Sequence, residues 1–183
     1  MIRLKKLLTE LKTQDIQQLL DKIQNNEFRF FDQGDNGRVY EIDAEDKLFK
    51  ITTESDEFDI ASTIVGRYSE FSTFIPIYYV NEKKMLYIMS KADRLNVNDT
   101  INIEQFMKSY KQYARDMGGE VSIFDYLDAD GARENDEEVI SFIRALQTDI
   151  GKMDNLTGDL ALDLDFKTDN IMRWQGRLVL IDW

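Results

Sequence analysis

Four polar side chains recur at short spacing near the end of the sequence. Asp165 and Asn170 lie five positions apart with Lys167 between them, and Asp182 follows the apolar stretch "LVLI". A carboxylate such as Asp165 can accept a proton from a hydroxyl group, while Asn170 and Asp182 offer oxygen atoms that can hold Mg²⁺. The ammonium group of Lys167 can neutralise a migrating phosphoryl group. These residues predict metal-assisted phosphoryl transfer, which requires no histidine, and the chain contains none.

Two glycines in the first third of the chain could serve the same chemistry. Gly34 and Gly37 stand between two predicted strands, in the stretch "FDQGDNGRVY". Glycine at such a place lets backbone N–H groups approach a polyphosphate without interference from a Cβ atom. An ordinary hairpin turn explains the same two residues equally well.

A lysine inside an apolar strand is the next candidate. Lys50 lies in "LFKI", where a mostly buried ammonium group needs an anion nearby. The alternative is a surface lysine whose charged end reaches water. Glu57, at the start of the following predicted helix, is the favoured partner for Lys50, and Glu54 and Glu70 compete for that role.

Composition narrows the possible partners and compartments. A chain of 183 residues, 43% of them hydrophobic, fits one domain or two small lobes that share a cleft. Its 35 acidic and 23 basic side chains leave a net charge of −12, and with no local basic patch evident we expect no binding to nucleic acid or to an anionic membrane. No apolar run approaches the ~20 residues of a membrane span, and the first residues lack a signal-peptide core. We therefore expect a soluble, cytoplasmic protein.

Periodicity predicts a sheet with one inserted helix, followed by a mainly helical half. The first 26 residues are predicted to be helical, because leucine and isoleucine recur at helical spacing. Alternating segments then predict about five strands in an antiparallel meander, interrupted by a helix that Ser55 caps. Helices are predicted at residues 101–117 and around residues 139–153, and a hairpin turned at "WQG" ends the chain. The predicted strands of the sheet are "EFRFFDQ", "RVYEI", "KLFKIT", "FIPIYYV" and "KMLYIM".

Four short motifs occur in this order along the chain, and together they resemble the protein kinase superfamily. "GDNGRV" resembles the glycine-rich loop, "LFKI" the strand of the phosphate-binding lysine, "DFKTDN" the catalytic loop and "LIDW" the metal-binding aspartate motif. The resemblance covers residues 28–183 and extends to the short kinase-like proteins of bacteriophages. It implies a two-lobed α+β fold with a minimal, truncated large lobe. The expected parts are a helical extension (residues 1–26), a small β-rich lobe with the hinge (27–92) and a mainly helical catalytic lobe (93–183).

The resemblance also implies cofactors and roles for individual residues. ATP and Mg²⁺ are the expected cofactors, with Asp165, Lys167 and Lys50 as catalytic residues and Asn170 and Asp182 as metal ligands. The implied nucleotide site further comprises Gly34, Gly37, Val39, Leu48, Glu57, Met89, the backbone from Ser90 to Ala92, Met172 and Ile181.

Departures from the family pattern leave the activity open between three alternatives. Asp32 replaces the first glycine of the loop, Asp163 and Leu164 replace the His-Arg pair before the catalytic aspartate, and Trp183 stands where an activation segment would begin. Transfer of the γ-phosphate of ATP to a serine or threonine hydroxyl of a protein is favoured, because small-molecule kinases generally build the acceptor site from helices beyond the metal-binding aspartate. The alternatives are a small-molecule kinase of the aminoglycoside or choline phosphotransferase type and a non-catalytic, kinase-like binding or inhibitor module.

The acidic stretch "DYLDADGARENDEE" invites a further comparison with calcium-binding loops. Asp125, Asp128, Asp130 and Glu137, with Gly131 among them, lack the regular ligand spacing of such loops, so a solvated loop is favoured. The stretch could also dock a basic protein partner. We therefore expect a protein substrate or partner, in the host cytoplasm if a phage encodes the chain.

Overall fold

The structure is a computed structural model of the whole chain, and it describes residues 15–34, 36–119, 121–129, 132, 135–157 and 167–182. The chain has an α+β fold and forms two compact units. The sheet unit comprises Met1–Arg67 and Pro76–Lys91, and the helical unit comprises Tyr68–Ile75 and Ala92–Trp183. Among the described residues, no helix combines the length and the apolar character needed to cross a membrane.

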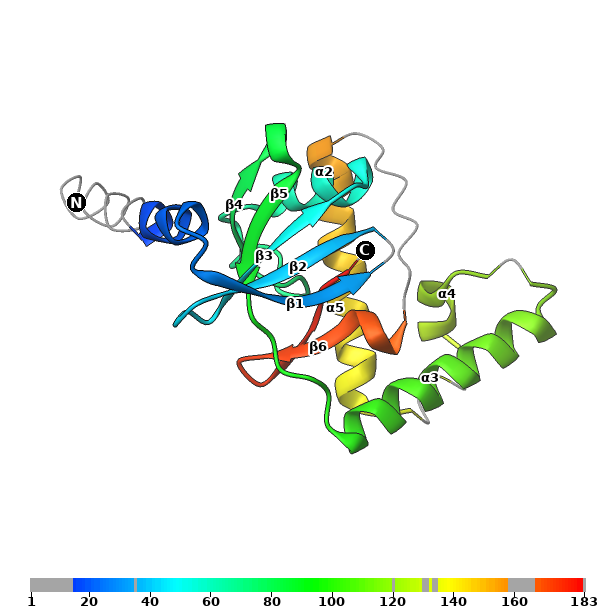
Figure 1. Cartoon of the computed structure of the whole chain (residues 1–183). Helices are drawn as coiled ribbons and strands as arrows, with labels where there is room; N and C mark the ends of the chain where they lie inside the picture. The colour runs from blue at the N-terminus through cyan, green and yellow to red at the C-terminus, as the bar shows by residue number, and fades with distance from the viewer. Residues whose placement is uncertain are drawn as a thin grey trace, which may run out of the picture. The chain divides into compact units, whose positions relative to one another are not determined.

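The sheet unit contains a five-stranded antiparallel sheet, which confirms the predicted strands (Figure 1). The order across the sheet is β1-β2-β3-β5-β4, so only the last two strands depart from a simple meander. The departure arises because the helix α2 intervenes between β3 and β4 in the chain. The strands are β1 (Phe28–Gly34), β2 (Gly37–Ile42), β3 (Lys47–Thr52), β4 (Ile77–Asn81) and β5 (Leu86–Ser90).

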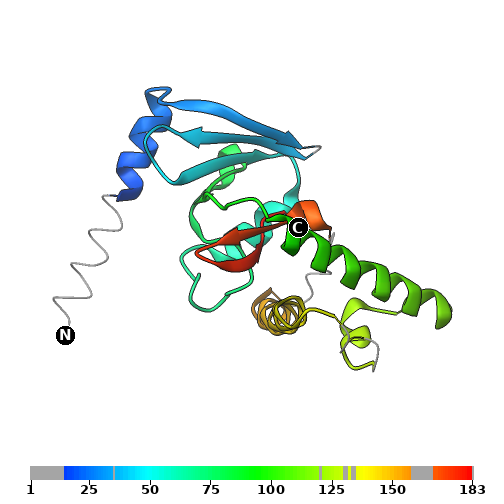
Figure 2. The same ribbon diagram turned by 90° about the horizontal axis from the view of Figure 1, so that it is seen from below.

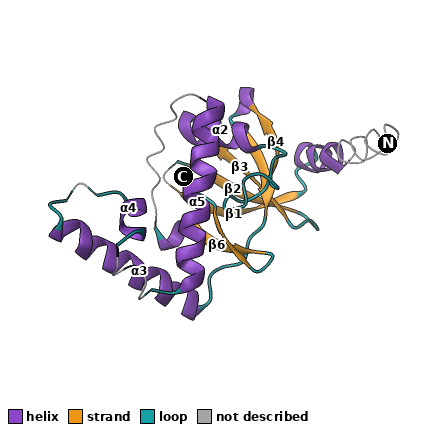
Figure 3. Ribbon diagram, turned by 180° about the vertical axis from the view of Figure 1, so that it is seen from behind, coloured by secondary structure: helices purple, strands orange, loops and turns teal. Residues whose placement is uncertain are grey.

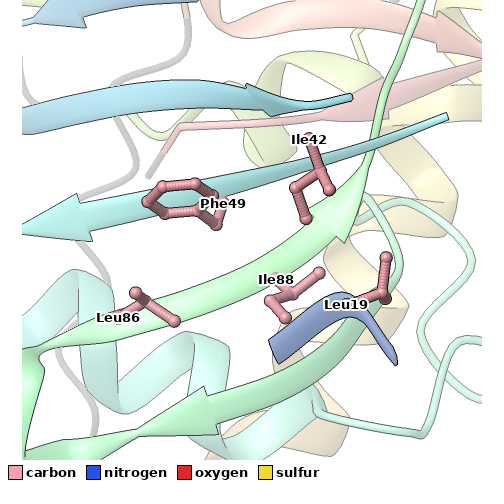
Figure 4. Packing of buried hydrophobic residues seen from close by; sticks show 5 residues of the cluster. All are labelled: Leu19, Ile42, Phe49, Leu86 and Ile88. Atoms are coloured by element: carbon pink, nitrogen blue, oxygen red, sulfur yellow. The ribbon is translucent and has the colours of Figure 1, made fainter. Parts of the chain in front are cut away.

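One face of this sheet packs against the helical residues 15–24. Side chains alternate between the two faces of a strand, so Ile42, Phe49 and Ile88 fall on the same side and are buried there with Leu19 of the helix (Figure 4). The ring of Phe49 stacks on Tyr40 with centroids 4.8 Å apart. The predicted first helix therefore covers apolar sheet surface, at least over its described part.

The opposite face of the sheet carries the inserted helix α2 (Ser55–Ile64). Its buried side chains recur at helical spacing and include Phe58, Ile60 and Ala61. The prediction that Ser55 caps this helix is wrong. Ser55 is the first helical residue, and the cap position belongs to Glu54, which lies two residues after the end of β3. The side chain of Glu54 makes no capping hydrogen bond.

The described part of the helical unit contains two long helices, one short helix and a β-hairpin. In Figure 2, α5 is seen along its axis while α3 lies across the view, and Figure 3 shows α4 beside α3. The predicted C-terminal hairpin is confirmed, with Gln175 and Gly176 at its turn, both at positive φ. The elements are α3 (Val97–Asp116), α4 (Ile123–Leu127), α5 (Glu137–Thr157), the 3-10 turn η3 (Thr168–Asn170), β6 (Ile171–Trp174) and β7 (Arg177–Leu180).

Residues 68–75 belong to the helical unit, whereas the sequence placed them with the small lobe. The buried carboxylate of Asp149 on α5 accepts hydrogen bonds from the N–H and the hydroxyl of Thr73, both at 2.9 Å. The N–H of Leu180 donates to the carbonyl oxygen of Thr73 at 2.7 Å, so β7 is also attached to this segment. These contacts join residues far apart in the sequence, which periodicity alone could not reveal.

The acidic stretch is partly helical rather than a solvated loop. Asp125 forms a capping box with Ser122 at the start of α4, and Tyr126 in the same helix is buried. Asp136 accepts hydrogen bonds from the N–H groups of Glu138 and Val139 at the start of α5. Asp130 and Gly131 lie outside the described residues. The acids that the structure describes here therefore include two that cap helices.

Candidate functional site

A buried ion pair joins β3 to α2 in the sheet unit. The Nζ atom of Lys50 lies 2.6 Å from Oε1 of Glu57, and the two side chains are only 7% and 2% exposed. The partner is therefore Glu57, and the competing predictions of Glu54 and Glu70 are wrong for this contact, since both lie exposed. The alternative of a surface lysine is also excluded.

Two hydroxyl groups lie close to the carboxylate of Glu57. Tyr87 on β5, directly opposite Lys50 in the sheet, donates a hydrogen bond to Oε1. The hydroxyl of Thr52 lies 2.7 Å from Oε2 of Glu57 and 3.0 Å from the carbonyl oxygen of Asn36, so its single hydrogen can be donated to either. Thr52 thus lies between the ion pair and the tip of the β1-β2 hairpin. Buried charges are normally retained only with such pairing and hydrogen bonding.

The two glycines of that hairpin have different surroundings. They pair with each other across the hairpin, as the alternative of an ordinary turn requires. A Cβ atom on Gly37 would lie 2.5 Å from the carbonyl oxygen of Ile51 and 3.2 Å from Cε of Lys50, whereas a Cβ atom on Gly34 would have no atom within 4 Å. Gly37 therefore allows β2 to lie close to β3 and leaves room for the stem of Lys50.

Three other predicted nucleotide-site residues share a sheet face with Lys50. Val39 pairs with Lys50, and Leu48 pairs with Met89, so strand alternation directs all four side chains to one side. Leu48 and Met89 are buried and Val39 is half-buried. This face is the one that carries α2, and the structure therefore groups these residues around the ion pair.

The predicted hinge residues differ in what their backbone can offer. The N–H of Ser90 already donates to the carbonyl oxygen of Pro76 at 3.0 Å, and its hydroxyl lies 2.7 Å from that of Tyr78. This N–H is therefore engaged within the sheet unit, because a backbone N–H donates only one strong bond. Nucleotide hydrogen bonds from the rest of the Ser90–Ala92 backbone stay a prediction. Ser90 lies in the sheet unit and Ala92 in the helical unit.

The remaining predicted residues lie in the helical unit. The N–H of Ile181 donates to the backbone carbonyl oxygen of Asn170 at 2.9 Å. Ile181 is the residue directly before Asp182, so the backbone next to Asp182 is bonded to Asn170. Met172 is half-buried on β6, and Lys167 is exposed just before η3. Asp165 and Trp183 lie outside the described residues.

Asn170 and Asp182 fit a magnesium ion by the chemistry of their side chains. Amide and carboxylate oxygens are hard donors, and Mg²⁺ is commonly bound through one or two carboxylates together with substrate phosphates. Within the described ranges, no three His, Cys, Asp or Glu side chains gather closely enough to form a metal site by themselves. A metal held here would take further oxygen ligands from water or from a bound phosphate.

An arginine network positions the hairpin that follows η3, and the sequence analysis missed it. Arg173 on β6 donates to both carboxylate oxygens of Asp99, at 2.6 and 2.7 Å, and to those of Glu138, at 2.9 and 2.8 Å. These hydrogen bonds hold the pKa of Asp99 below its ordinary value and raise the pKa of Arg173. The starts of α3 and α5 are thereby attached to the strand next to Asn170.

A basic hollow on the helical unit was also missed. Lys108, Lys111 and Arg115 on α3 and Lys167 before η3 line a hollow of about 520 Å³. The expectation of no local basic patch is therefore wrong. The signal available in the sequence was the spacing of the three cations in "KSYKQYAR", which places them on one face of a helix.

No protein-family model matches the chain, and no curated protein matches it significantly.

Proposed function

We propose that the chain is an ATP-dependent phosphotransferase of the protein kinase type, with a serine or threonine hydroxyl of a protein as acceptor. The observation that carries the proposal is the buried ion pair of Lys50 on β3 with Glu57 on α2. A lysine inside a five-stranded sheet is costly to bury, and replacing such a pair by apolar residues is often neutral or stabilising. Stability alone therefore does not explain these two charges, and an ammonium group held by a glutamate from a neighbouring helix is the arrangement that kinases use for ATP phosphates.

The order of the other groups supports the same proposal. The hairpin with Gly34 and Gly37 precedes Lys50, and Asp165, Asn170 and Asp182 follow in the other unit. In the proposed reaction, Asp165 accepts the proton of the acceptor hydroxyl, whose oxygen forms a bond to the γ-phosphorus of ATP while the bond to the β,γ-bridging oxygen breaks and ADP leaves. Bound Mg²⁺, held by Asn170 and Asp182, would supply positive charge against the phosphate oxygens.

A non-catalytic kinase-like binding module is the second candidate function. It is favoured by Asp32, whose exposed carboxylate lies on β1 two residues before Gly34 and accepts a hydrogen bond from the N–H of Gln33 at 2.8 Å. A carboxylate at this position repels the phosphates of a nucleotide. Calorimetry distinguishes the two candidates, because the binding module predicts no heat of binding for MgATP at millimolar concentration.

The decisive variant is Lys50→Met, which keeps most of the apolar stem and removes the charge. We expect it to remain folded, because Glu57 keeps its two hydroxyl neighbours, with the free energy of unfolding lowered by about 3 to 5 kcal/mol. MgATP affinity, measured by calorimetry, and phosphate transfer from labelled ATP to lysate proteins should both be lost. Glu57→Gln should reproduce part of this loss.

The matched control is Lys47→Met on the same strand. Lys47 alternates to the other face of β3, where its ammonium group lies over the ring of Tyr78. This variant should keep both MgATP affinity and transfer. Equal affinity of the Lys50→Met protein and the unaltered chain would exclude Lys50 as a phosphate-binding residue and overturn the proposal.

A further inference from the structure

The basic hollow on the helical unit combines side chains from two distant parts of the sequence. Lys108, Lys111 and Arg115 follow one face of α3, and α3 lies against η3, which brings Lys167 to the same hollow. All four side chains are exposed. Among the described residues, two acids, Glu104 and Asp169, share the lining, so four described positive charges face two described negative ones in a chain whose net charge is −12.

Two of the three cations on α3 make no side-chain interaction with the described part of the fold. Neither Lys108 nor Lys111 forms an ion pair or a side-chain hydrogen bond with any described residue, and the guanidinium group of Arg115 donates to the amide oxygen of Gln112 at 2.9 Å. By contrast, Arg173 and Lys152 of the same unit bind carboxylates. Like charges three and four residues apart on a helix repel each other. Glu104, four residues before Lys108 on α3, offsets part of this cost, and an anionic ligand would relieve more of it.

The hollow lies close along the chain to the proposed catalytic base. Lys167 follows Asp165 by two residues, and two consecutive Cα–Cα steps of 3.8 Å span no more than about 7.6 Å. An acceptor hydroxyl at Asp165 would therefore place the neighbouring residues of its own chain near the hollow.

We propose that the hollow binds acidic side chains flanking the acceptor hydroxyl, so that the protein substrate is phosphorylated within an Asp- and Glu-rich segment. This inference rests on the proposed function and names its substrate class. It concerns another surface than the acidic stretch, for which a basic partner stays a prediction. A short acidic segment is favoured over nucleic acid. The phosphates of a nucleic acid would extend beyond the hollow, where the strongly acidic protein would repel them.

The test compares two short synthetic peptides that each contain one serine. One carries Asp and Glu on both sides of the serine and the other carries Asn and Gln at the same positions. Binding of the corresponding Ser→Ala peptides is followed by fluorescence anisotropy without ATP, and phosphate transfer to the serine peptides is followed with labelled ATP. The unaltered chain should bind the acidic peptide at least about tenfold more tightly than the neutral one, and added salt should reduce the difference.

The variant Lys108→Glu/Lys111→Glu should abolish this preference. Its matched control is Lys83→Glu/Lys84→Glu, an equal change of charge at two exposed lysines of the sheet unit. The control should keep the preference to within about twofold, because a local site and not the net charge determines it.

The outcomes separate this inference from the proposed function. Three results would each overturn the acidic-segment inference. The first is equal affinity for both peptides, and the second is an equal loss of the peptide preference in both double variants. The third is displacement of the bound acidic peptide by single-stranded DNA at a lower concentration than by unlabelled acidic peptide. If lysate proteins accept phosphate while the peptide preference is absent, the inference fails and the proposed function stands. If the acidic peptide binds through Lys108 and Lys111 while MgATP does not bind, phosphate transfer fails and the hollow remains a site for acidic segments.

Discussion

The ammonium group of Lys50 is buried and does not reach water. Its position in an apolar strand indicates a buried charge, but the same sequence fits a lysine that reaches water. The distance of 2.6 Å to Glu57 and the burial of both side chains distinguish these cases. The neighbouring hydroxyls of Thr52 and Tyr87 then explain how the carboxylate is accommodated away from water.

Gly37→Ala should destabilise the sheet unit, and Gly34→Ala should not. The added Cβ atom at position 37 would lie 2.5 Å from a backbone oxygen of β3, which a side-chain rotation cannot relieve. We expect urea denaturation to show a loss of about 1 to 3 kcal/mol for Gly37→Ala and a change within about 0.5 kcal/mol for Gly34→Ala. Similar losses in both variants would show that the close approach of β2 and β3 is not the cause.

At the scale of elements, the Arg173 network attaches β6 to the starts of two helices. Asp99 belongs to the capping box of α3 and also accepts two hydrogen bonds from Arg173. Glu138 lies in the first turn of α5, where a carboxylate is favoured by the helix dipole. The network therefore holds the strand that follows Asn170, one of the proposed metal ligands.

Asp99→Asn should lower stability in a pH-dependent way. The pKa of Asp99 is lowered in the folded chain by the hydrogen bonds from Arg173, so its stabilising contribution is complete above the unfolded value of about 3.9 and is lost as the pH falls through the folded pKa. At pH 7 we expect a loss of about 2 kcal/mol, measured by urea denaturation. The gap between the variant and the unaltered chain should narrow below about pH 4.

Asp154→Asn is the control for this measurement. Asp154 is an exposed acid of α5, and its replacement should leave the free energy of unfolding nearly unchanged at each pH. A gap between Asp99→Asn and the unaltered chain that stays constant down to pH 3 would contradict the assignment of the pH dependence to Asp99.

The residues assigned to the proposed reaction belong to two different compact units of the molecule. The sheet unit supplies Lys50 and Glu57, and the helical unit supplies Asn170 and Asp182. The basic hollow lies on the helical unit as well, so a chain with a strongly negative net charge presents a local surface of opposite sign. Net charge alone is therefore a poor guide to the ligands of this molecule.

Replacement of Asp165 and replacement of Asp182 should have different effects on the proposed reaction. Asp165→Asn should retain MgATP affinity while lowering the rate of transfer by about 10²-fold or more, the scale of positioned acid–base groups. Asp182→Asn should weaken both MgATP affinity and transfer, because a metal ligand also helps to hold the phosphates. Calorimetry and labelled-ATP assays measure the two effects, with Asp154→Asn as the control. Equal losses of affinity in both variants would refute this division of roles.

The local pattern of the sequence was sufficient for most of the secondary structure and for the pairing of Lys50. Alternation and helical spacing depend on neighbouring residues, so they predicted the five strands of the sheet, the two long helices and the final hairpin. The pairing of Lys50 with Glu57 could be predicted because the two residues are close in sequence. Lys50 lies near the end of β3, and Glu57 lies in the first turn of α2, the next element of the chain.

Only the tertiary structure decided the contacts between residues that are distant in sequence. Arg173 and Asp99 are separated by 74 positions, and nothing local in either stretch indicates the other. The same holds for Thr73 with Asp149 and for Lys167 with the cations of α3. Such contacts arise when packing brings elements together. Burial of apolar surface stabilises any arrangement that removes this surface from water, and the sequence pattern does not specify which elements meet.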